Sequence, residues 1–512
     1  MSSSGHRSRR ASKAYGIKLD KRAKRSRSAN GTRVSGWERA LQAIGLGFVA
    51  YVIRRTGSAL GAVLSSSWLL SLPFAALLML TSVDFLVLTS VNDSINNLFF
   101  DELGLTVDDV RRDDAELFKT QVLQYLYIAL LLLTVVHWRE VYGYFKQWPH
   151  LILIMSVLLF GALYSIEPLK VLTNAILIMI GFMVAILFSL AHATRRNFRA
   201  FYVAVFLPML VLHVASFFIF LEYDRDIIDF VFSSRRYGGL AGNPNSLGAT
   251  AVLGYWAAGC LVLSRSVGVV LRGMALLALP LFVLHIVMSG SGTAISAIVL
   301  VTIALFWLRI LAAFKSVTRQ ALNAGAAVLL VLLLIAVVIS STPADLYLSF
   351  TESLGKDASL TGRTELWDVA RHAISLRPYF GWGFDSHTSV MAEGAFAIEF
   401  NHYHNGFLDT LVAGGAVLLV LVLYNLLRFV RAFFVAFDKD SNVFPLVVPL
   451  IMLLFLNLSE YSLLRPNSQI WTIYIVSFVM LTFHQRDRLL SKISSARRKG
   501  GSGRQKRQLR WA

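Results

Sequence analysis

Long apolar runs separated by short polar breaks repeat along the chain from about residue 67 onward. Each run is close to the ~20 apolar residues that a helix needs to cross a bilayer. The pattern therefore predicts an all-α, polytopic integral membrane protein with about twelve transmembrane helices. The expected cores of these helices are 67–89, 120–137, 150–166, 171–190, 200–221, 246–264, 273–289, 293–313, 323–340, 406–427, 444–459 and 468–484.

Two basic tails flank this apolar region. Residues 1–36 and 490–512 are dense in Arg and Lys, and the whole chain has a formal net charge of +19. Residues 37–55 place apolar side chains at helical spacing, which predicts an amphipathic helix lying in the membrane interface. The expected organisation is thus a disordered tail (1–36), an interfacial helix (37–55), a transmembrane domain (56–489) and a second tail (490–512).

The distribution of charge predicts the orientation of the chain. An even number of spans puts both tails on one side, and the positive-inside rule makes that side the cytoplasm. Since each tail flanks membrane spans, we expect the tails to contact anionic lipids rather than nucleic acid. Cys260 is the only cysteine, so neither an intrachain disulfide nor a site of several cysteines is expected.

Two segments expected on the outer side oppose the positive-inside rule. They are residues 222–245 and the long loop 341–405, between the ninth and tenth expected spans. Arginine on a translocated loop requires a reason, and an anionic ligand provides one. Their basic residues are Arg235, Arg236, Lys356, Arg363, Arg371 and Arg377.

The long loop contains a predicted helix. An apolar stripe between Leu366 and Ile374 has helical spacing, Thr361 is a candidate N-cap and Pro378 ends the segment. Arg363 then lies in the first turn, where free backbone N–H groups and a guanidinium suit an anion. The alternative is an ordinary ion pair between Arg363 and a loop carboxylate such as Glu365.

The end of the same loop carries His402, His404, Asn405 and Asp409, just before the next span. A histidine titrates near neutral pH and can accept a proton from a hydroxyl group. The alternatives are interfacial histidines without a role, or a metal-binding pair. A metal site would need a third ligand at matched spacing, and the sequence shows none. We therefore predict no metal site.

Segment 222–245 ends in three glycines and Asn243-Pro-Asn245, which indicates a tight backbone that opens a helix. Arg236 beside exposed N–H groups suits a phosphate, whereas the alternative is a plain turn. His213 and His285, within spans, are expected to be mostly structural. Glu460, at the outer end of a span, is expected to pair with Arg465.

An ordered set of motifs resembles the O-antigen ligase and polymerase superfamily over roughly residues 200–485. The segments Leu354–Thr364 and Asn401–Asp409 look most like bacterial exopolysaccharide polymerases. Gly292-Thr293 stands where ligase-type members often carry an arginine. The motifs are Arg236-x-x-Gly239-x-x-x-Asn243-Pro-Asn245, Ser289-Gly-Ser291, Thr361-Gly-Arg363-x-x-x-Trp367, Pro378-x-x-Gly381-x-Gly383 and His404-Asn405-x-x-Leu408.

The resemblance implies a GT-C-like, metal-independent, inverting glycosyltransferase that needs no cofactor. Its donor would be a glycan on undecaprenyl pyrophosphate, at the periplasmic face of a bacterial inner membrane. By motif match, His404 would deprotonate the acceptor hydroxyl, and Arg236, Arg363 and Arg235 would hold the pyrophosphate. The supporting residues would be Asn405, His402, Asn243, Asn245, Asp409 and Trp367.

Three functions are weighed. The first is a polymerase that transfers a growing glycan onto a lipid-linked repeat unit, with export or chain-length proteins as further partners. The second is a ligase that transfers the glycan to lipid A core or another acceptor. The third is a transporter or flippase, which would be expected to keep its polar groups near the bilayer midplane. Here these groups gather at the outer edge, which favours an enzyme.

Overall fold

The computed structural model describes twelve stretches of the chain. The chain divides into two compact units, Met1–Leu64 and Ser65–Ala512, and all described residues lie in the second. The predicted tail 1–36, the interfacial helix 37–55 and the span core 323–340 lie outside the described residues. The described stretches are 67–83, 99–100, 109–192, 198–223, 226–232, 235–264, 266–311, 363–384, 402–437, 441–458, 460–466 and 468–498.

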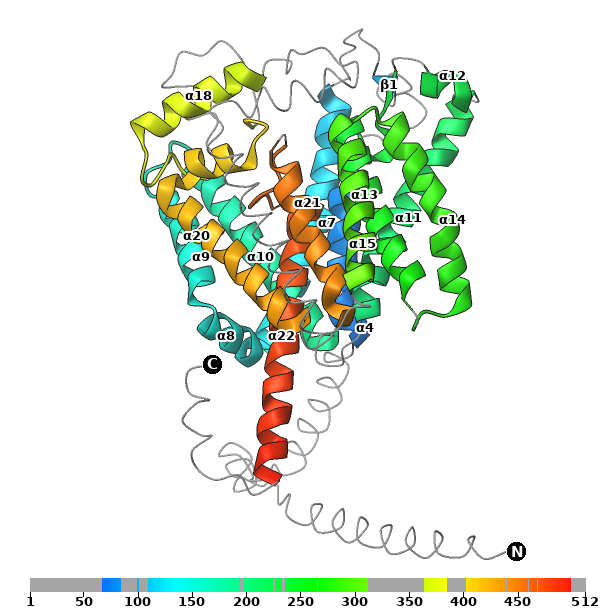
Figure 1. Ribbon diagram of the computed structural model, residues 1–512. Helices are drawn as coiled ribbons and strands as arrows, with labels where there is room; N and C mark the ends of the chain where they lie inside the picture. Colours follow the sequence, from blue (N-terminus) through cyan, green and yellow to red (C-terminus); the bar gives the residue numbers. More distant parts are fainter. Residues whose placement is uncertain are drawn as a thin grey trace, which may run out of the picture. The chain divides into compact units, whose positions relative to one another are not determined.

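Nearly all of the described chain is helical (Figure 1). The α-helices are α4 (Ser67–Ser82), α7 (Asp109–Val136), α8 (Trp138–Gln147), α9 (Pro149–Gly161), α10 (Pro168–His192), α11 (Phe198–Tyr223), α12 (Ile227–Phe232), α13 (Pro244–Leu263), α14 (Val269–Met288), α15 (Gly292–Leu311), α18 (Arg363–Leu376), α20 (Gly406–Phe437), α21 (Val448–Leu456) and α22 (Gln469–Arg498). Two 3₁₀ helices, η1 (Gly239–Ala241) and η2 (Ser441–Val447), join them. Two short strands, β1 (Phe99–Phe100) and β2 (Arg236–Tyr237), pair antiparallel.

Five of the described helices are long and apolar enough to cross a membrane, namely α10, α11, α13, α14 and α20. A sixth span results if α7 and α8, bent by 83° at their junction, count as one. Shorter apolar helical stretches lie in α4, α9, α15, α21 and α22 and in η2. This confirms the predicted helical class and agrees with a polytopic membrane protein. The number of twelve spans and the placement of the long loop stay predictions.

Helix α13 has apolar side chains around its whole circumference and packs against α11, α14 and α15. Its Trp256 ring is fully buried and meets the rings of Phe201 and Tyr202 edge-on, at 5.7 and 5.8 Å between centroids. Such a helix belongs in the interior of a bundle. Its N-terminus, near Asn243, is thereby fixed among its neighbours.

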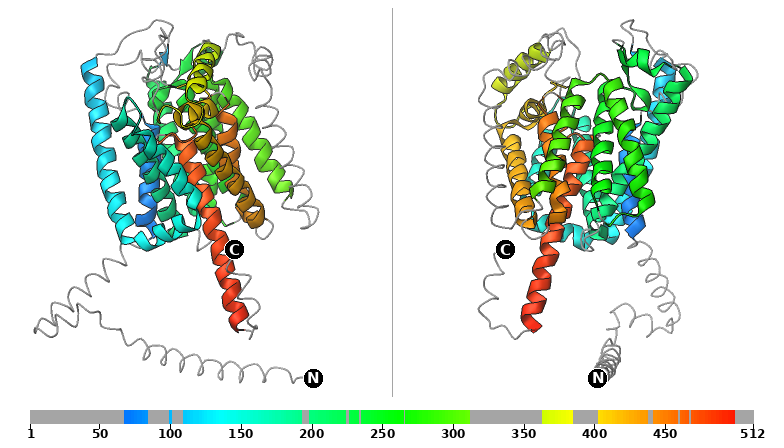
Figure 2. Two further views of the ribbon diagram at one scale, coloured as in Figure 1. Left: turned by 90° about the vertical axis from the view of Figure 1, so that its left-hand side faces the viewer. Right: turned by 45° about the vertical axis from the view of Figure 1, so that its right-hand side comes forward.

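Helix α18 lies at one end of the bundle, and the C-terminal part of α22 extends beyond the other end (Figures 1 and 2). The predicted loop helix is thus present and ends before Pro378, as expected. Thr361, its predicted N-cap, lies outside the described residues. Leu366, Val369 and Ala370 of α18 are buried against the chain at the start of α20.

Helix α20 is interrupted at Gly415, whose φ of 62° and ψ of −164° are not helical. The backbone N–H groups of residues 416 and 417 donate to the carbonyls of residues 378 and 379, at 2.8 and 3.2 Å. In the opposite direction, the N–H groups of residues 382 and 383, in the turn after α18, donate to the carbonyls of residues 412 and 413 in α20, at 2.8 and 2.9 Å. The turn after α18 therefore supplies the hydrogen bonds that the broken helix lacks. This exchange fixes α18 to α20.

Gly415→Ala is expected to lower the free energy of unfolding by more than about 1 kcal/mol, because the site requires a positive φ. In addition, a Cβ at this position would lie 2.2 Å from the carbonyl carbon of Tyr379. Thermal unfolding of the detergent-purified protein measures the effect.

Gly143→Ala in α8 is the matched control. No atom lies within 4 Å of the Cβ it would add, so the unfolding temperature should stay the same or rise. Equal unfolding temperatures of the two variants would contradict the proposed role of Gly415 in the hydrogen bonds between α20 and the turn after α18.

Candidate functional site

Four loops meet at the end of the bundle that carries α18. They are residues 235–243 before α13, 289–291 between α14 and α15, 402–405 before α20, and the connection between α21 and α22. Helix packing brings them together, because α13 contacts α14 and α15, α15 contacts α21, and α22 contacts α20. Sequence segments more than 200 residues apart thus contribute to one site.

Arg236 is half-buried and held by two directed contacts. Its Nε donates to the carbonyl oxygen of Ser289 at 3.0 Å, and its Nη2 donates to Oδ1 of Asn245 at 2.7 Å. Gly290, with a φ of 57°, lies against the aliphatic part of the side chain, and a Cβ there would be 3.2 Å from Arg236 Cγ. The Ser289-Gly-Ser291 motif therefore forms the support for this guanidinium.

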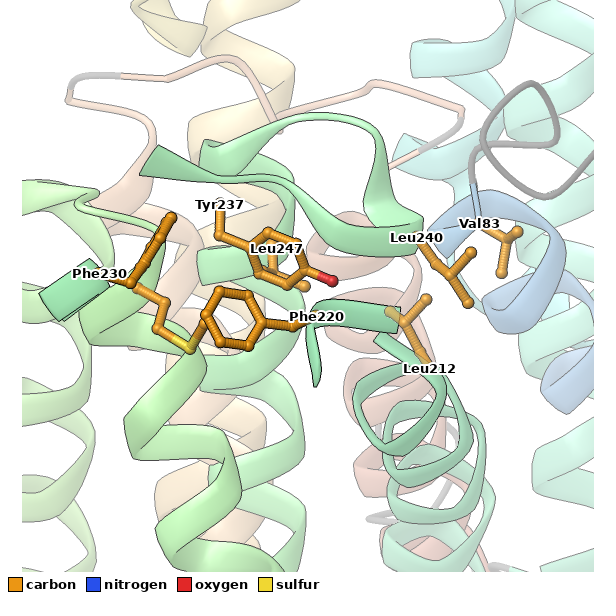
Figure 3. Packing of buried hydrophobic residues seen from close by; sticks show 8 residues of the cluster. Val83, Leu212, Phe220, Phe230, Tyr237, Leu240 and Leu247 are labelled. Carbon is orange, nitrogen blue, oxygen red and sulfur yellow. The ribbon is translucent and has the colours of Figure 1, made fainter. Parts of the chain in front are cut away.

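A buried apolar cluster anchors the strand that presents Arg236 (Figure 3). The next residue, Tyr237, points the opposite way, as successive residues of a strand do. Its ring packs edge-on against Phe220 and Phe230, and its hydroxyl donates to the carbonyl of Ser216 at 2.6 Å. Burial raises the pKa of the Tyr237 hydroxyl, which keeps it a neutral donor.

Asn243 and Asn245 have different roles: Asn243 caps a helix, and Asn245 contacts charged side chains. Asn243 is the N-cap of α13, and its side chain accepts from the backbone N–H of Asn245 at 2.8 Å. Asn245 uses its carboxamide for charged partners instead. Its oxygen accepts from Arg236, and its Nδ2 lies 3.4 Å from Oε1 of Glu460, which accepts from it.

His404 occupies a special backbone position. Its φ is 49°, a left-handed conformation that few non-glycine residues adopt and that is typical of functional sites. Its backbone N–H donates to Nδ1 of His402 at 3.2 Å, and the two rings lie 4.0 Å apart between centroids. Asn405 then caps α20, because its Oδ1 accepts from the N–H groups of Phe407 and Leu408 at 3.0 and 3.1 Å.

Helix α18 fixes the His404 turn through Tyr403, which is fully buried. The indole N–H of Trp367 donates to the carbonyl of Tyr403 at 2.9 Å. The carboxylate of Asp409, also buried, accepts from the Tyr403 N–H at 3.3 Å. Burial raises the pKa of the Tyr403 hydroxyl, and the Asp409 charge adds to the shift. Trp367 and Asp409 therefore fix the backbone of the turn through hydrogen bonds to Tyr403.

Glu460 comes from the connection between α21 and α22, whose backbone Asn457 holds. The Asn457 Oδ1 accepts from the N–H groups of Ser462 and Leu463 at 2.9 and 2.8 Å, and its carbonyl accepts from the N–H of Gly406 at 3.0 Å. The Glu460 Oε2 consequently lies 3.5 Å from Nδ1 of His404. Both side chains are partly exposed, at 23% and 30%.

The structure thus joins the predicted base and a predicted anion-binding cation through a chain of side chains. We call this the polar cluster, and its members are Arg236, Asn245, Glu460, His404 and His402. Glu460 is the residue whose place the sequence did not predict. Among the described residues it contacts Asn245 and His404, while Arg465, its expected partner, lies over the Tyr461 ring at 5.5 Å. The signal available was an ionisable residue at the end of a span.

The remaining outer arginines have other neighbours. Arg235 stacks on the Phe230 ring at 4.9 Å, and Arg377 stacks on the Trp382 ring at 4.0 Å. Arg371 pairs with Asp368 on the surface of α18. Arg363 begins α18, where its predicted first-turn position holds, but its side chain lies outside what the structure describes. Arg371 thus has a carboxylate partner and Arg377 an aromatic partner, and an anion at these outer arginines stays a prediction.

Part of the site lies within a stretch that matches a known protein family. Residues 273–423 match the family model described as O-Antigen ligase. This stretch is similar to that family. The match confirms the resemblance to the O-antigen ligase and polymerase superfamily, and it supports a glycosyltransferase of the ligase and polymerase type in general. A search of curated proteins found no match.

The matched stretch contributes His402, His404 and the Ser289-Gly-Ser291 support to the site. Arg236, Asn245 and Glu460 lie outside the matched stretch, on its two sides in sequence. The polar cluster therefore combines residues of the matched stretch with residues that come before and after it in the sequence.

Asn245→Ala is expected to lower glycan transfer because it removes the only described side chain that contacts both Arg236 and Glu460. The loss of these two contacts to charged groups predicts a fall in kcat/KM of about 10- to 100-fold. Transfer assays on the detergent-purified protein measure it.

The matched variant is Asn243→Ala, two residues away. It removes a helix cap at a cost of about 1 kcal/mol in stability and leaves the Arg236 contact in place. Its kcat/KM should stay near that of the wild type. Equal losses of activity in the two variants would mean that Asn245 acts only as part of the helix start.

Proposed function

We propose that the protein is a polysaccharide polymerase of the periplasmic face of a bacterial inner membrane. It transfers a growing glycan from undecaprenyl pyrophosphate onto a hydroxyl of a lipid-linked repeat unit, with inversion at the anomeric carbon. The observation that carries the proposal is the joining of Arg236 to His404 through Asn245 and Glu460. A cation for a leaving group and a base for an acceptor are the two groups that this reaction requires.

His404 is proposed as the general base. Its Nδ1 is buried and faces Glu460, while the side chain as a whole is 30% exposed, so Nε2 is the nitrogen that an acceptor can approach. The negative charge of the Glu460 carboxylate, 3.5 Å away, favours a proton on Nδ1, which leaves the lone pair on Nε2. Glu460 is thus a positioning residue that selects the reactive tautomer.

The proposed step balances as a displacement. The acceptor oxygen forms a bond to the anomeric carbon of the donor glycan, and its proton passes to Nε2 of His404. The bond between the anomeric carbon and the pyrophosphate oxygen breaks, and its electron pair leaves with the lipid pyrophosphate. Arg236, and Arg363 as the second proposed cation, stabilise the charge on that leaving group. A pyrophosphate is already activated, so we expect the reaction to need no metal ion.

A lipid donor agrees with the surroundings of α20. An apolar groove of about 660 Å³ lies between α9 and α20 and is lined by Leu153, Val157, Phe160, Phe380 and Val420, among others. Such a groove has the chemistry that a prenyl chain requires. Since α20 also begins at the His404 turn, one helix contributes to both surfaces.

The decisive assay supplies purified protein with labelled undecaprenyl-pyrophosphate repeat units and no other acceptor, and separates the products by size. A ladder of products is expected. His404→Ala should lower its rate by about 10²- to 10⁴-fold, the usual contribution of a general base. His372→Ala, at an exposed histidine of α18, is the control and should leave the ladder unchanged.

Other outcomes of the assay contradict the proposal. Transfer only after lipid A core or a protein acceptor is added would identify a ligase. Labelled lipid that crosses the membrane without any transfer would identify a transporter. Normal activity of His404→Ala would refute the assignment of the base.

Arg236→Lys tests the cation. Lysine keeps the charge but loses the forked contacts to Ser289 and Asn245, so kcat/KM for the lipid donor should fall by about 10- to 100-fold. Arg363→Lys should behave in the same way. Arg371→Lys, at a surface arginine paired with Asp368, is the control and should have little effect. Full activity of Arg236→Lys would show that its directed contacts are not needed.

A further inference from the structure

His402, His404 and Glu460 bring three potential metal ligands together. One nitrogen of each imidazole and one carboxylate oxygen all lie within 4.8 Å of one another, and all three side chains are partly exposed. The two histidines precede α20, and the carboxylate comes from the connection between α21 and α22. The folded chain thus supplies the third ligand that the sequence does not reveal. Two imidazoles and one carboxylate are a known ligand set for zinc sites with an open position.

The separation of one ligand pair, His404 and Glu460, suits a bound metal ion. Nδ1 of His404 lies 3.5 Å from Oε2 of Glu460, whereas a charge-assisted hydrogen bond measures about 2.7–2.9 Å. Zinc bonds of about 2.0–2.1 Å in tetrahedral geometry place two ligand atoms about 3.3 Å apart. Moreover, the buried His404 Nδ1 has no hydrogen-bond partner among the described residues.

Neighbouring residues already orient the carboxylate. Asn245 Nδ2 donates to Oε1 of Glu460 at 3.4 Å, which leaves Oε2 directed at His404. Asn457 fixes the loop backbone on which Glu460 stands. Hydrogen bonds of this kind, one shell beyond the ligands, are what hold carboxylates in position at metal sites.

We propose that His402, His404 and Glu460 bind Zn²⁺, and that the bound ion switches off glycan transfer. The inhibitory effect rests on the proposed role of His404 as the base. Zinc on Nδ1 takes the lone pair of that nitrogen, so the neutral ring must carry its proton on Nε2. An Nε2–H group is a donor and is unable to accept the proton of an acceptor hydroxyl. Zinc and the proton on Nδ1 therefore compete for the same nitrogen of His404, the one that faces Glu460.

Direct binding tests the site without any glycan substrate. The full-length protein in detergent is stripped with EDTA and titrated with Zn²⁺ alone by equilibrium dialysis, and Co²⁺ then reports the geometry through its visible absorption. One zinc ion per chain and the strong absorption of four-coordinate Co²⁺ are expected. Glu460→Gln and His402→Asn should each weaken zinc binding by at least about 10-fold. Thermal unfolding checks that both variants fold.

His372→Asn, at an exposed histidine outside the cluster, is the matched control and should bind zinc as the wild type does. Equal zinc affinity in all variants, or no binding at micromolar zinc, would overturn the site whatever the protein's activity.

The assay of polymer formation tests the inhibition. Transfer should proceed in EDTA, stop when zinc saturates the site and return when EDTA is added again. Zinc that binds without slowing transfer would overturn the inhibition. Loss of transfer in EDTA, restored by zinc, would make the ion part of the catalyst and overturn it as well. If no transfer occurs under any condition, the proposed function is contradicted. The zinc site is not, because equilibrium dialysis measures zinc binding without a glycan substrate.

Discussion

The carboxamide of Asn457 satisfies a stretch of backbone that has neither helix nor strand to pair with. In an apolar bundle, every such polar group must find a partner inside the protein, because an unpaired one costs several kcal/mol. Asn457 accepts from two N–H groups of its own loop, and its carbonyl receives the first N–H of α20. The turn that presents His404 and the loop that presents Glu460 are thereby tied together, and the geometry of the site depends on that tie.

The same constraint explains why the site gathers at one end of the helices. Polar side chains are tolerated where helices begin and end, and there they also satisfy the free backbone groups. Asn243 and Asn405 cap α13 and α20, and the residues beside them, Asn245 and His404, are left for other partners. A cation, an amide, a carboxylate and two imidazoles then form one connected cluster. Such an arrangement suits a reaction that moves a proton to one group and negative charge toward another.

Much of this was predictable from the sequence, and the parts that were not depend on contacts between distant segments. Helical periodicity identified α18, and glycine and asparagine spacing identified a helix start at Asn243 or Asn245, since both are local properties of the chain. The motifs led to Arg236 and His404, and residues 273–423 match the expected family. Sequence spacing did not predict that Glu460, 56 positions after His404, would reach its ring. Nor did it predict the break of α20 at Gly415, because the compensating hydrogen bonds come from the turn after α18.

The central claim is that the polar cluster holds the pyrophosphate of a lipid-linked glycan beside His404. Electron cryomicroscopy of the protein with a phosphonate analogue of undecaprenyl-pyrophosphate glycan, which resists cleavage, tests this most directly. We expect pyrophosphate density against the Arg236 guanidinium, with the anomeric carbon on the side that faces His404 Nε2. Pyrophosphate bound elsewhere, with Arg236 still engaged only by Ser289 and Asn245, would contradict it.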